Sequence, residues 1–248
     1  MRKRPHWAFE LLVVAFLLVI YDVIAGQAHL RADAAIAHGR DMLALSPEGF
    51  ELSADTWLAS VGWLRDPASL YYDLAHIDVT LAVLVAGFVW RGEVYRRART
   101  ALVSINLIGL VVFFLYPVAP PRLLPGAGFV DIVGLSGTWQ SSPASVQHSN
   151  AFGSMPSLHS AWAVWVALTV MAMTSRRWLH GLAWLHVALT FVFVVLTGNH
   201  YVIDIVAGIA TALVAWALAP SLNLRWALRS TEVSQEVHRE RAAVSEPS

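Results

Sequence analysis

The 248-residue sequence contains no cysteine. This absence excludes disulfide bonds, thiolate metal sites and cysteine nucleophiles. Charged residues are also scarce, at 14% of the chain, and 17 basic residues balance 17 acidic ones. A formal net charge of zero argues against nucleic acid as a partner. The sequence also lacks an internal repeat or a low-complexity tract, so no repeat architecture is predicted.

Apolar residues, in contrast, make up 57% of the chain, which is too many for a soluble globular protein. A membrane-spanning helix needs roughly 20 mostly apolar residues. Six segments meet or approach this requirement, namely 7–25, 74–90, 101–116, 157–174, 182–198 and 201–219. We therefore predict an all-α fold, a six-transmembrane-helix bundle in the cell membrane.

The segments between and beyond these spans complete the predicted organisation. Two short amphipathic helices, 28–45 and 51–64, are predicted to lie on the membrane surface between the first and second spans. Asp66-Pro67 is typical of a helix start, so the second span is expected to begin there. The polar tail from residue 221 is expected to lack regular structure. We therefore predict three parts: 1–65 with the first span and the surface helices, 66–219 as the main membrane domain, and 220–248 as a cytoplasmic tail.

The first apolar segment follows Met-Arg-Lys-Arg, as the apolar region of a signal peptide would. It is long, contains Glu10 and Asp22, and lacks a small-residue cleavage site. These features indicate a retained transmembrane helix rather than a cleaved signal peptide.

Basic residues predict the orientation of the bundle. Thirteen of the 17 lysines and arginines fall on one side of the predicted membrane: Arg2, Lys3, Arg4, Arg91, Arg96, Arg97, Arg99, Arg176, Arg177, Arg225, Arg229, Arg239 and Arg241. The other side carries Arg31, Arg40, Arg65 and Arg122. The positive-inside rule therefore predicts that both termini are cytoplasmic.

Three polar stretches fall on the predicted outer rim. They read YPVAPPRLLPG at 116–126, MPSLHS at 155–160 and TGNHYVIDIVAG at 197–208. His200 and Asp204 are spaced i, i+4, so they lie on one face of the last span. The carboxylate can accept a hydrogen bond from one imidazole nitrogen and leave the other free to attack. The sequence therefore predicts His200 as a nucleophile that Asp204 orients.

Two further residues complete a set for phosphoryl transfer. Arg122 is the lone basic residue of the 117–156 loop and can bind an anion with two donors. His159, at a helix start, can protonate a leaving oxygen. This set calls for no metal and no cofactor, because the chain offers no cluster of carboxylates suited to Mg²⁺.

At these residues the chain resembles the type 2 phosphatidic acid phosphatases, a superfamily of integral-membrane lipid phosphatases and phosphotransferases. Their three motifs read KxxxxxxRP, PSGH and SRxxxxxHxxxD, and the resemblance covers roughly residues 70–219. It implies that His200 is the nucleophile, Asp204 its partner and His159 the proton donor. It further implies that Arg122 and Ser157 bind the phosphate. The residue sequences of the three motifs are most similar to those of the branch that contains fungal inositol phosphorylceramide synthase.

The sequence also departs from the family pattern. The lysine of the first motif falls at Leu115, the arginine of the third at Val194, and the glycine of PSGH at Leu158. Losing two cations weakens the hold on a dianionic phosphomonoester and favours a phosphodiester or a substrate with other anchors. The resemblance leaves the substrate lipid open, as well as the choice between hydrolysis and transfer and the oligomeric state.

Three other readings of the same residues stay open at this point. An intramembrane serine protease would pair Ser154 or Ser157 with His200, although neither serine lies in a GxSxG-like turn. A zinc site would use His159, His200 and Asp204 as ligands. A non-catalytic lipid-phosphate-binding or transport protein would need anion ligands but no paired acid and nucleophile.

The remaining polar residues are expected to be structural. Ser154 is predicted to act as a turn or cap residue. His76 and Asp78 are expected to take part in packing, with a headgroup pocket as the alternative. His180 and His186 are expected to lie toward the cytoplasmic side without a connection to the site.

Overall fold

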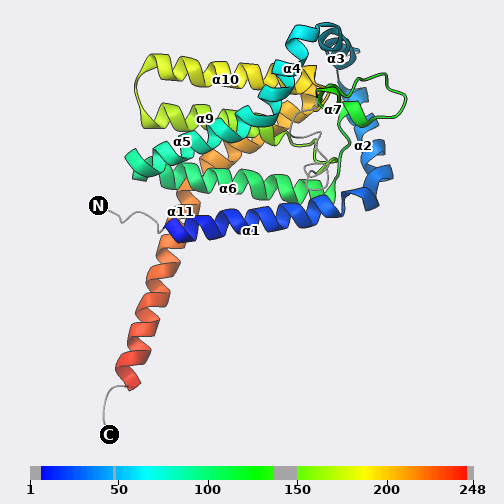
Figure 1. Ribbon diagram of the computed structural model, residues 1–248. Helices are drawn as coiled ribbons and strands as arrows, with labels where there is room; N and C mark the ends of the chain where they lie inside the picture. The colour runs from blue at the N-terminus through cyan, green and yellow to red at the C-terminus, as the bar shows by residue number, and fades with distance from the viewer. Residues whose placement is uncertain (1–6, 47–48, 137–149, 245–248) are drawn as a thin grey trace.

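The computed structural model describes residues 7–46, 49–136 and 150–244, and within these ranges it is helical with one isolated bridge, between Val118 and Gly153. Figure 1 shows long helices lying side by side and shorter helices gathered at one end. The all-α prediction is therefore confirmed. The three basic residues at positions 2–4 lie outside the described residues.

The central helix of the bundle is α9 (Leu158–Met173), which contacts α5 (His76–Trp90), α6 (Gly92–Leu115), α10 (Arg177–Leu196) and α11 (Val202–Val244). Half of its residues are buried, and the indole nitrogen of Trp165 donates to the Ala98 carbonyl at 2.7 Å. Alanines line its contacts with α6 and α11, because small side chains let helices approach closely.

Gly208 shows how close this approach is. A Cβ atom on Gly208 would lie 2.4 Å from the carbonyl oxygen of Ser157. Any larger residue would therefore push α11 away from the start of α9. This contact brings together the two helix starts that carry the predicted histidines and carboxylate.

Within the described residues, five helices are long and apolar enough to span a membrane, so the prediction of six spans is not confirmed. They are α1 (Trp7–Gly26), the continuous helical segment Gly62–Trp90, α6, α10 and the Val202–Asn223 part of α11. The predicted fourth span forms α9, which has only 16 residues. Since α9 is enclosed by other helices, its composition reflects a protein interior as much as a lipid surface.

The outer helix α1 lies along α6 (Figure 1). Most of its apolar side chains are exposed. Between α1 and the bundle come η1 (Ala28–Arg31), α2 (Ala32–Leu45), α3 (Phe50–Ser60) and α4 (Gly62–Leu70). The first two match the predicted segment 28–45, and α3 covers most of 51–64. Figure 1 places these short helices together at one end of the molecule.

Two predicted boundaries are wrong. The helix expected to start at Asp66-Pro67 begins at Gly62, and Pro67 lies inside α4. It continues through a π-helical turn, η2 (Tyr71–Ala75), into α5. The tail is also helical, because α11 runs through Pro220 to Val244. Residues 222–244 contain no glycine or further proline and many strong helix formers, which outweigh their polarity.

Candidate active site

The turn between α10 and α11 carries His200 and is tightly constrained. Gly198 has a φ of 62°, and a Cβ on it would lie 2.9 Å from a carboxylate oxygen of Asp55. The backbone N–H groups of Asn199 and His200 both donate to the Val194 carbonyl. The sequence Gly-Asn-His thus places the imidazole in a fixed position at the start of α11.

Asp204 orients this imidazole. His200 Nδ1 lies 3.4 Å from Asp204 Oδ2, and both side chains are buried. The same oxygen accepts hydrogen bonds from the Tyr201 backbone N–H at 3.0 Å and from the Ser154 hydroxyl. An ionised carboxylate only accepts, so the proton of a neutral His200 lies on Nδ1. The lone pair of His200 is therefore on Nε2.

His159 faces that nitrogen from the first turn of α9. His159 Nδ1 lies 3.4 Å from His200 Nε2. The ring of His159 stacks on Tyr72 at a centroid distance of 4.5 Å and tilts against His76 at 4.1 Å. Its position is therefore held by neighbouring rings from η2 and α5, while Nε2 is buried without a hydrogen-bond partner among the described residues.

Ser157 caps the start of α9 and ties it to α11. Its hydroxyl oxygen accepts from the Ser160 N–H at 3.3 Å. Its own backbone N–H donates to the Asp204 carbonyl at 3.1 Å. A role of Ser157 at the phosphate stays a prediction, and its contacts connect the helix of His159 to the helix of His200.

Arg122, in η3 (Pro121–Leu123), lies beside the turn between α10 and α11 that carries His200. Its backbone N–H donates to the Gly198 carbonyl at 2.9 Å, and its Nε donates to Asn199 Oδ1 at 2.8 Å. Its Nη1 forms an ion pair with Asp131 at 3.1 Å. The guanidinium is thus held next to His200 by two side chains, and sequence reasoning identified neither Asn199 nor Asp131.

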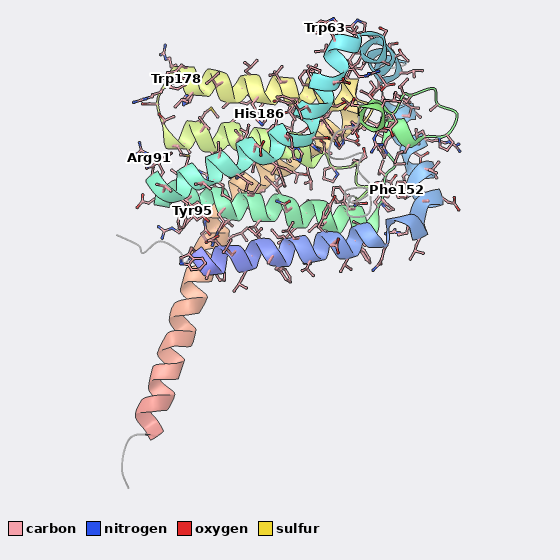
Figure 2. All side chains as sticks on the ribbon, in the orientation of Figure 1. Trp63, Arg91, Tyr95, Phe152, Trp178 and His186 are labelled. Carbon is pink, nitrogen blue, oxygen red and sulfur yellow. The ribbon has the colours of Figure 1, made fainter. Side chains whose placement is uncertain are left out.

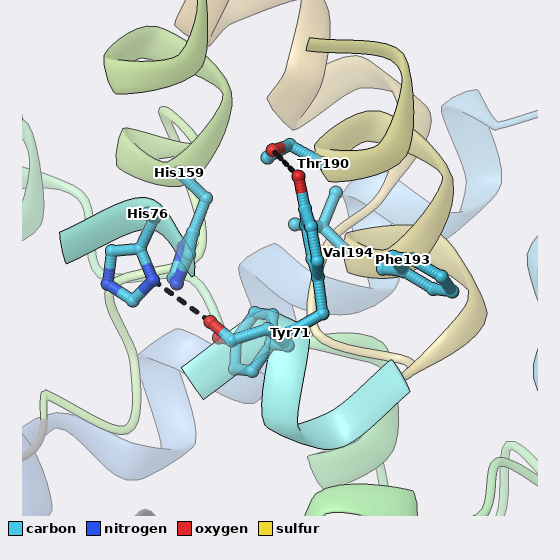
Figure 3. A pocket seen from close by; sticks show the side chains of 7 residues that line it. Tyr71, His76, His159, Thr190, Phe193 and Val194 are labelled. Atoms are coloured by element: carbon cyan, nitrogen blue, oxygen red, sulfur yellow. Dashed lines mark hydrogen bonds between the residues drawn. The ribbon is translucent and has the colours of Figure 1, made fainter. Parts of the chain in front are cut away.

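A small pocket opens beside His159 (Figure 3). Figure 3 shows His159 and His76 with their rings side by side, facing residues of α10. The lining residues are Tyr71, Tyr72, His76, His159, Thr190, Phe193 and Val194. His76, expected to be a packing residue, is therefore part of the wall of the site.

One of the two positions at which the family motifs carry a cation lies in the wall of this pocket. Val194 lines it and is 1% exposed, so an arginine there would reach the site directly. Leu115 is 67% exposed on the outside of α6. Only the loss at Val194 therefore changes the charge that a substrate meets inside the bundle.

His186 connects to this pocket, contrary to the prediction. Its Nδ1 lies 2.7 Å from the hydroxyl of Tyr71, which is one of the lining residues (Figure 2 labels His186 on α10). His180 instead contacts the Thr174 carbonyl, away from the site, as expected. Asp78 is exposed on α5.

Two carboxylates of α3 close the site from the side of the short helices. Glu51 Oε1 accepts from the Val202 N–H at the start of α11 at 3.2 Å. Asp55 Oδ2 accepts from the Val130 N–H at 2.7 Å. Both side chains are buried, and the second oxygen of each has no partner among the described residues. Burial, with a contribution from the nearby Asp131 charge, raises the pKa of Asp55 to about 6.

The structure thus brings four predicted residues, His159, His200, Asp204 and Ser157, into direct contact. Arg122 joins them through Asn199. Within the described ranges, no group of three or more histidine, aspartate or glutamate side chains is arranged to hold a metal ion.

Comparison with known proteins gives two matches. A family model described as PAP2 superfamily matches residues 48–218. A protein named phosphoinositol dihydroceramide synthase, from Bacteroides thetaiotaomicron, is 27% identical over 139 residues. That match covers 50% of this chain and 45% of the relative, so the chain spans less than half of the relative's length. It supports the resemblance to the inositol phosphorylceramide synthase branch. Because the family model covers well over half of the residues, and all three motifs lie inside it, the chain belongs to the PAP2 superfamily.

Proposed function

We propose that the protein is an integral membrane lipid phosphatase or phosphotransferase that works through a phosphohistidine on His200. The observation that carries this proposal is the direct approach of His159 Nδ1 to His200 Nε2 at 3.4 Å. It places a proton-donating group opposite a nucleophilic nitrogen whose other side is bonded to Asp204. Once a phosphoryl group separates the two nitrogens, this is the arrangement that acid-assisted nucleophilic displacement requires.

In the first step, His200 Nε2 attacks phosphorus and the bond from phosphorus to the leaving oxygen breaks. The electron pair moves to that oxygen, which takes a proton from His159. In the second step, the oxygen of water or of an alcohol attacks phosphorus. The now neutral His159 accepts the proton that this oxygen loses. The N–P bond breaks and its electrons return to His200 Nε2. Asp204 holds the Nδ1 proton throughout and stabilises the positive charge on the ring.

Arg122 is proposed to bind the non-bridging phosphate oxygens. Two of its nitrogens donate to Asn199 and Asp131 and fix the plane of the guanidinium. The remaining N–H groups offer a planar set of donors, which suits a phosphate better than a single ammonium does.

The serine protease alternative is less well supported by these contacts. The Ser154 hydroxyl donates to Asp204, and the Ser157 hydroxyl oxygen accepts from the backbone of α9. Both serines therefore have structural partners, whereas His200 Nε2 faces only the acid.

Trapping the adduct tests the mechanism. Purified protein incubated with a phospholipid labelled in the phosphate should give, after a denaturing quench, an acid-labile and base-stable label on the protein. His200→Ala should remove the label, whereas His180→Ala, remote from the site, should retain it. An unlabelled wild-type protein that still turns over the lipid would contradict the phosphohistidine.

Product analysis distinguishes the two reaction types. Incubation with a lipid panel, with and without inositol or another alcohol, should yield free phosphate from a hydrolase and a new phosphodiester from a transferase. The name of the bacterial relative favours transfer of a phosphoinositol group. Neither product, together with unchanged binding in His159→Ala and His200→Ala, would favour a non-catalytic lipid-binding protein.

We also propose that the site faces the extracytoplasmic side and that both termini are cytoplasmic. Since the chain lacks cysteine, Ser60→Cys and Ser175→Cys each introduce a single thiol at an exposed position at opposite ends of the bundle. An impermeant thiol reagent should label Cys at position 60 but not at position 175 in intact cells. The reverse pattern would place the site on the cytoplasmic side.

A further inference from the structure

The surroundings of Arg122 are rich in carboxylates. Asp131 forms an ion pair with its guanidinium, and Asp55 lies close enough to Asp131 for the two charges to influence each other. Asp55 also contacts the turn at Gly198, whose carbonyl accepts the Arg122 backbone N–H. The single guanidinium beside the nucleophile is therefore largely balanced before any substrate arrives.

Two other arginines on this side have partners outside the cluster. Arg31 donates to the carbonyl oxygens of Phe114 and Leu115. Arg65 pairs with its neighbour Asp66. The position that carries an arginine in the family's third motif is the buried Val194. Arg122 is thus the cation that pairs with Asp131 at the site.

We propose that Asp131 is a specificity-determining residue, whose negative charge makes the site select phosphate groups with one negative charge over those with two. The inference rests on the proposed phosphoryl-transfer function. A phosphodiester has one charge, and the Arg122 guanidinium can balance it. A phosphomonoester is largely dianionic at neutral pH, and the Asp131 carboxylate repels its second charge.

The size of this discrimination follows from Coulomb's law. A phosphate bound by Arg122 lies one guanidinium width from the Asp131 carboxylate, roughly 7 Å. At an effective dielectric constant of about 20, one extra unit charge at that distance corresponds to roughly 50-fold in binding. Partial exposure of Asp131, at 42% of its side chain, lowers this figure. We expect an effect of about 10-fold or more.

Asp131→Asn tests the negative charge of Asp131 separately from its role in positioning the Arg122 guanidinium. Oδ1 of Asp131 accepts from Arg122 Nη1 and from the Gly134 N–H, which caps the short helix α7 (Ile132–Leu135). An asparagine oxygen can accept both hydrogen bonds, and asparagine is as good an N-cap as aspartate. The variant therefore keeps Arg122 in place and removes only the negative charge.

The test uses p-nitrophenyl phosphate, a dianion at neutral pH, and p-nitrophenyl methyl phosphate, a monoanion with the same leaving group. For each variant, kcat/KM is measured on both, and the dianion-to-monoanion ratio is compared with that of the wild type, so that the intrinsic reactivities cancel. Asp131→Asn should raise this ratio by about 10-fold or more. Asp131→Glu, which keeps the charge, and Asp66→Asn, at the remote ion pair, should leave the ratio within about twofold of the wild type.

Two results would overturn the inference. An unchanged ratio in Asp131→Asn would show that the charge does not discriminate. An equal loss on both substrates would assign Asp131 to holding Arg122 in place. Either result leaves the phosphoryl-transfer proposal intact, provided that turnover still depends on His200. Wild-type protein with no His200-dependent turnover of either ester would refute both.

Discussion

The two ends of the bundle use polar residues in different ways. At the arginine end, around residues 90–100 and 216–223, Arg97 donates to the Trp216 carbonyl and Arg99 pairs with Glu10. Figure 2 shows Arg91 and Trp178 at this end, and Phe152 at the other. The site end, formed by the loops around residues 116–126, 150–158 and 197–202, holds histidines and carboxylates instead.

The difference lies in which polar atoms have partners. The contacts of the arginine end tie neighbouring helices together. At the site end, the atoms His159 Nε2, Asp204 Oδ1, Glu51 Oε2 and Asp55 Oδ1 are buried without a hydrogen bond among the described residues. Buried unpaired polar atoms are costly, so they are tolerated where they serve binding or catalysis. Polar groups at the arginine end thus stabilise the fold, whereas the unpaired polar groups at the site end are the ones that we propose to interact with a substrate.

The largest expected effect is at the two histidines. His200→Ala should abolish turnover of both lipid and activated aryl phosphates, because the nitrogen proposed to attack phosphorus is removed. His159→Ala should lower lipid turnover by about 10²–10⁴-fold and largely spare aryl phosphates, whose leaving groups need little protonation. Parallel kcat measurements on both substrate types check this split. Equal losses on both substrates in His159→Ala would make His159 a phosphate ligand.

A smaller loss is expected when Arg122 keeps its charge but changes shape. Arg122→Lys should lower kcat/KM by about 10–100-fold, since an ammonium cannot donate to Asn199, Asp131 and phosphate in one plane. The matched substitution Arg65→Lys, at an exposed pair, should have no effect on kcat/KM. Full activity of Arg122→Lys would show that a point charge suffices.

At the arginine end the same kind of substitution should affect stability alone. Arg97 donates to the Trp216 carbonyl and lies 4.5 Å from the Trp216 ring centroid. Arg97→Ala should lower the free energy of unfolding by about 1–2 kcal/mol and leave kcat per folded molecule unchanged. Thermal unfolding in detergent and activity of the folded fraction measure the two quantities, with the exposed Arg177→Ala as control. A fall in kcat would remove the distinction between the ends.

The smallest expected effect is a pH dependence at Asp55. Its pKa is raised to about 6, mainly by burial, so the folded protein favours the protonated carboxyl. The stabilisation is fully present below the unfolded pKa of about 4 and is lost as pH rises through about 6. Asp55→Asn should flatten the fall in unfolding midpoint between about pH 4 and pH 7. An identical slope in wild type and variant would mean that Asp55 does not titrate in this range.

The sequence predicted the polar core of the site well, because its motifs are local. His200 and Asp204 share one turn of helix, and Ser157 and His159 share one helix start, so spacing alone indicates their relation. Their mutual contact follows from helix packing at Gly208, which the motif resemblance anticipated and periodicity could not.

The sequence did not predict the residues outside the motifs that contact Arg122 and the turn at Gly198. Asp131 reaches Arg122 through a loop, and Glu51 and Asp55 reach the turn between α10 and α11 from a helix read as a membrane-surface element. Tyr72 and His76 enter the site because the π-helical turn η2 changes the helix register, and hydrophobic patterns do not report such a turn. The sixth predicted span is not confirmed for a related reason, since α9 has only 16 residues and is enclosed by other helices.

The 3.4 Å contact between His159 and His200, the two histidines proposed to be catalytic, leaves no room for a phosphoryl group between them. Substrate entry must therefore widen this gap, at the expense of contacts between the starts of α9 and α11. Acyl chains bound along the apolar helices can supply free energy for that opening that a small water-soluble ester lacks, so such esters should be turned over more slowly than lipids. Shortening the acyl chains of a lipid substrate should consequently reduce kcat as well as affinity. Acyl-chain length would then affect the rate of a reaction at histidines that the chains never contact.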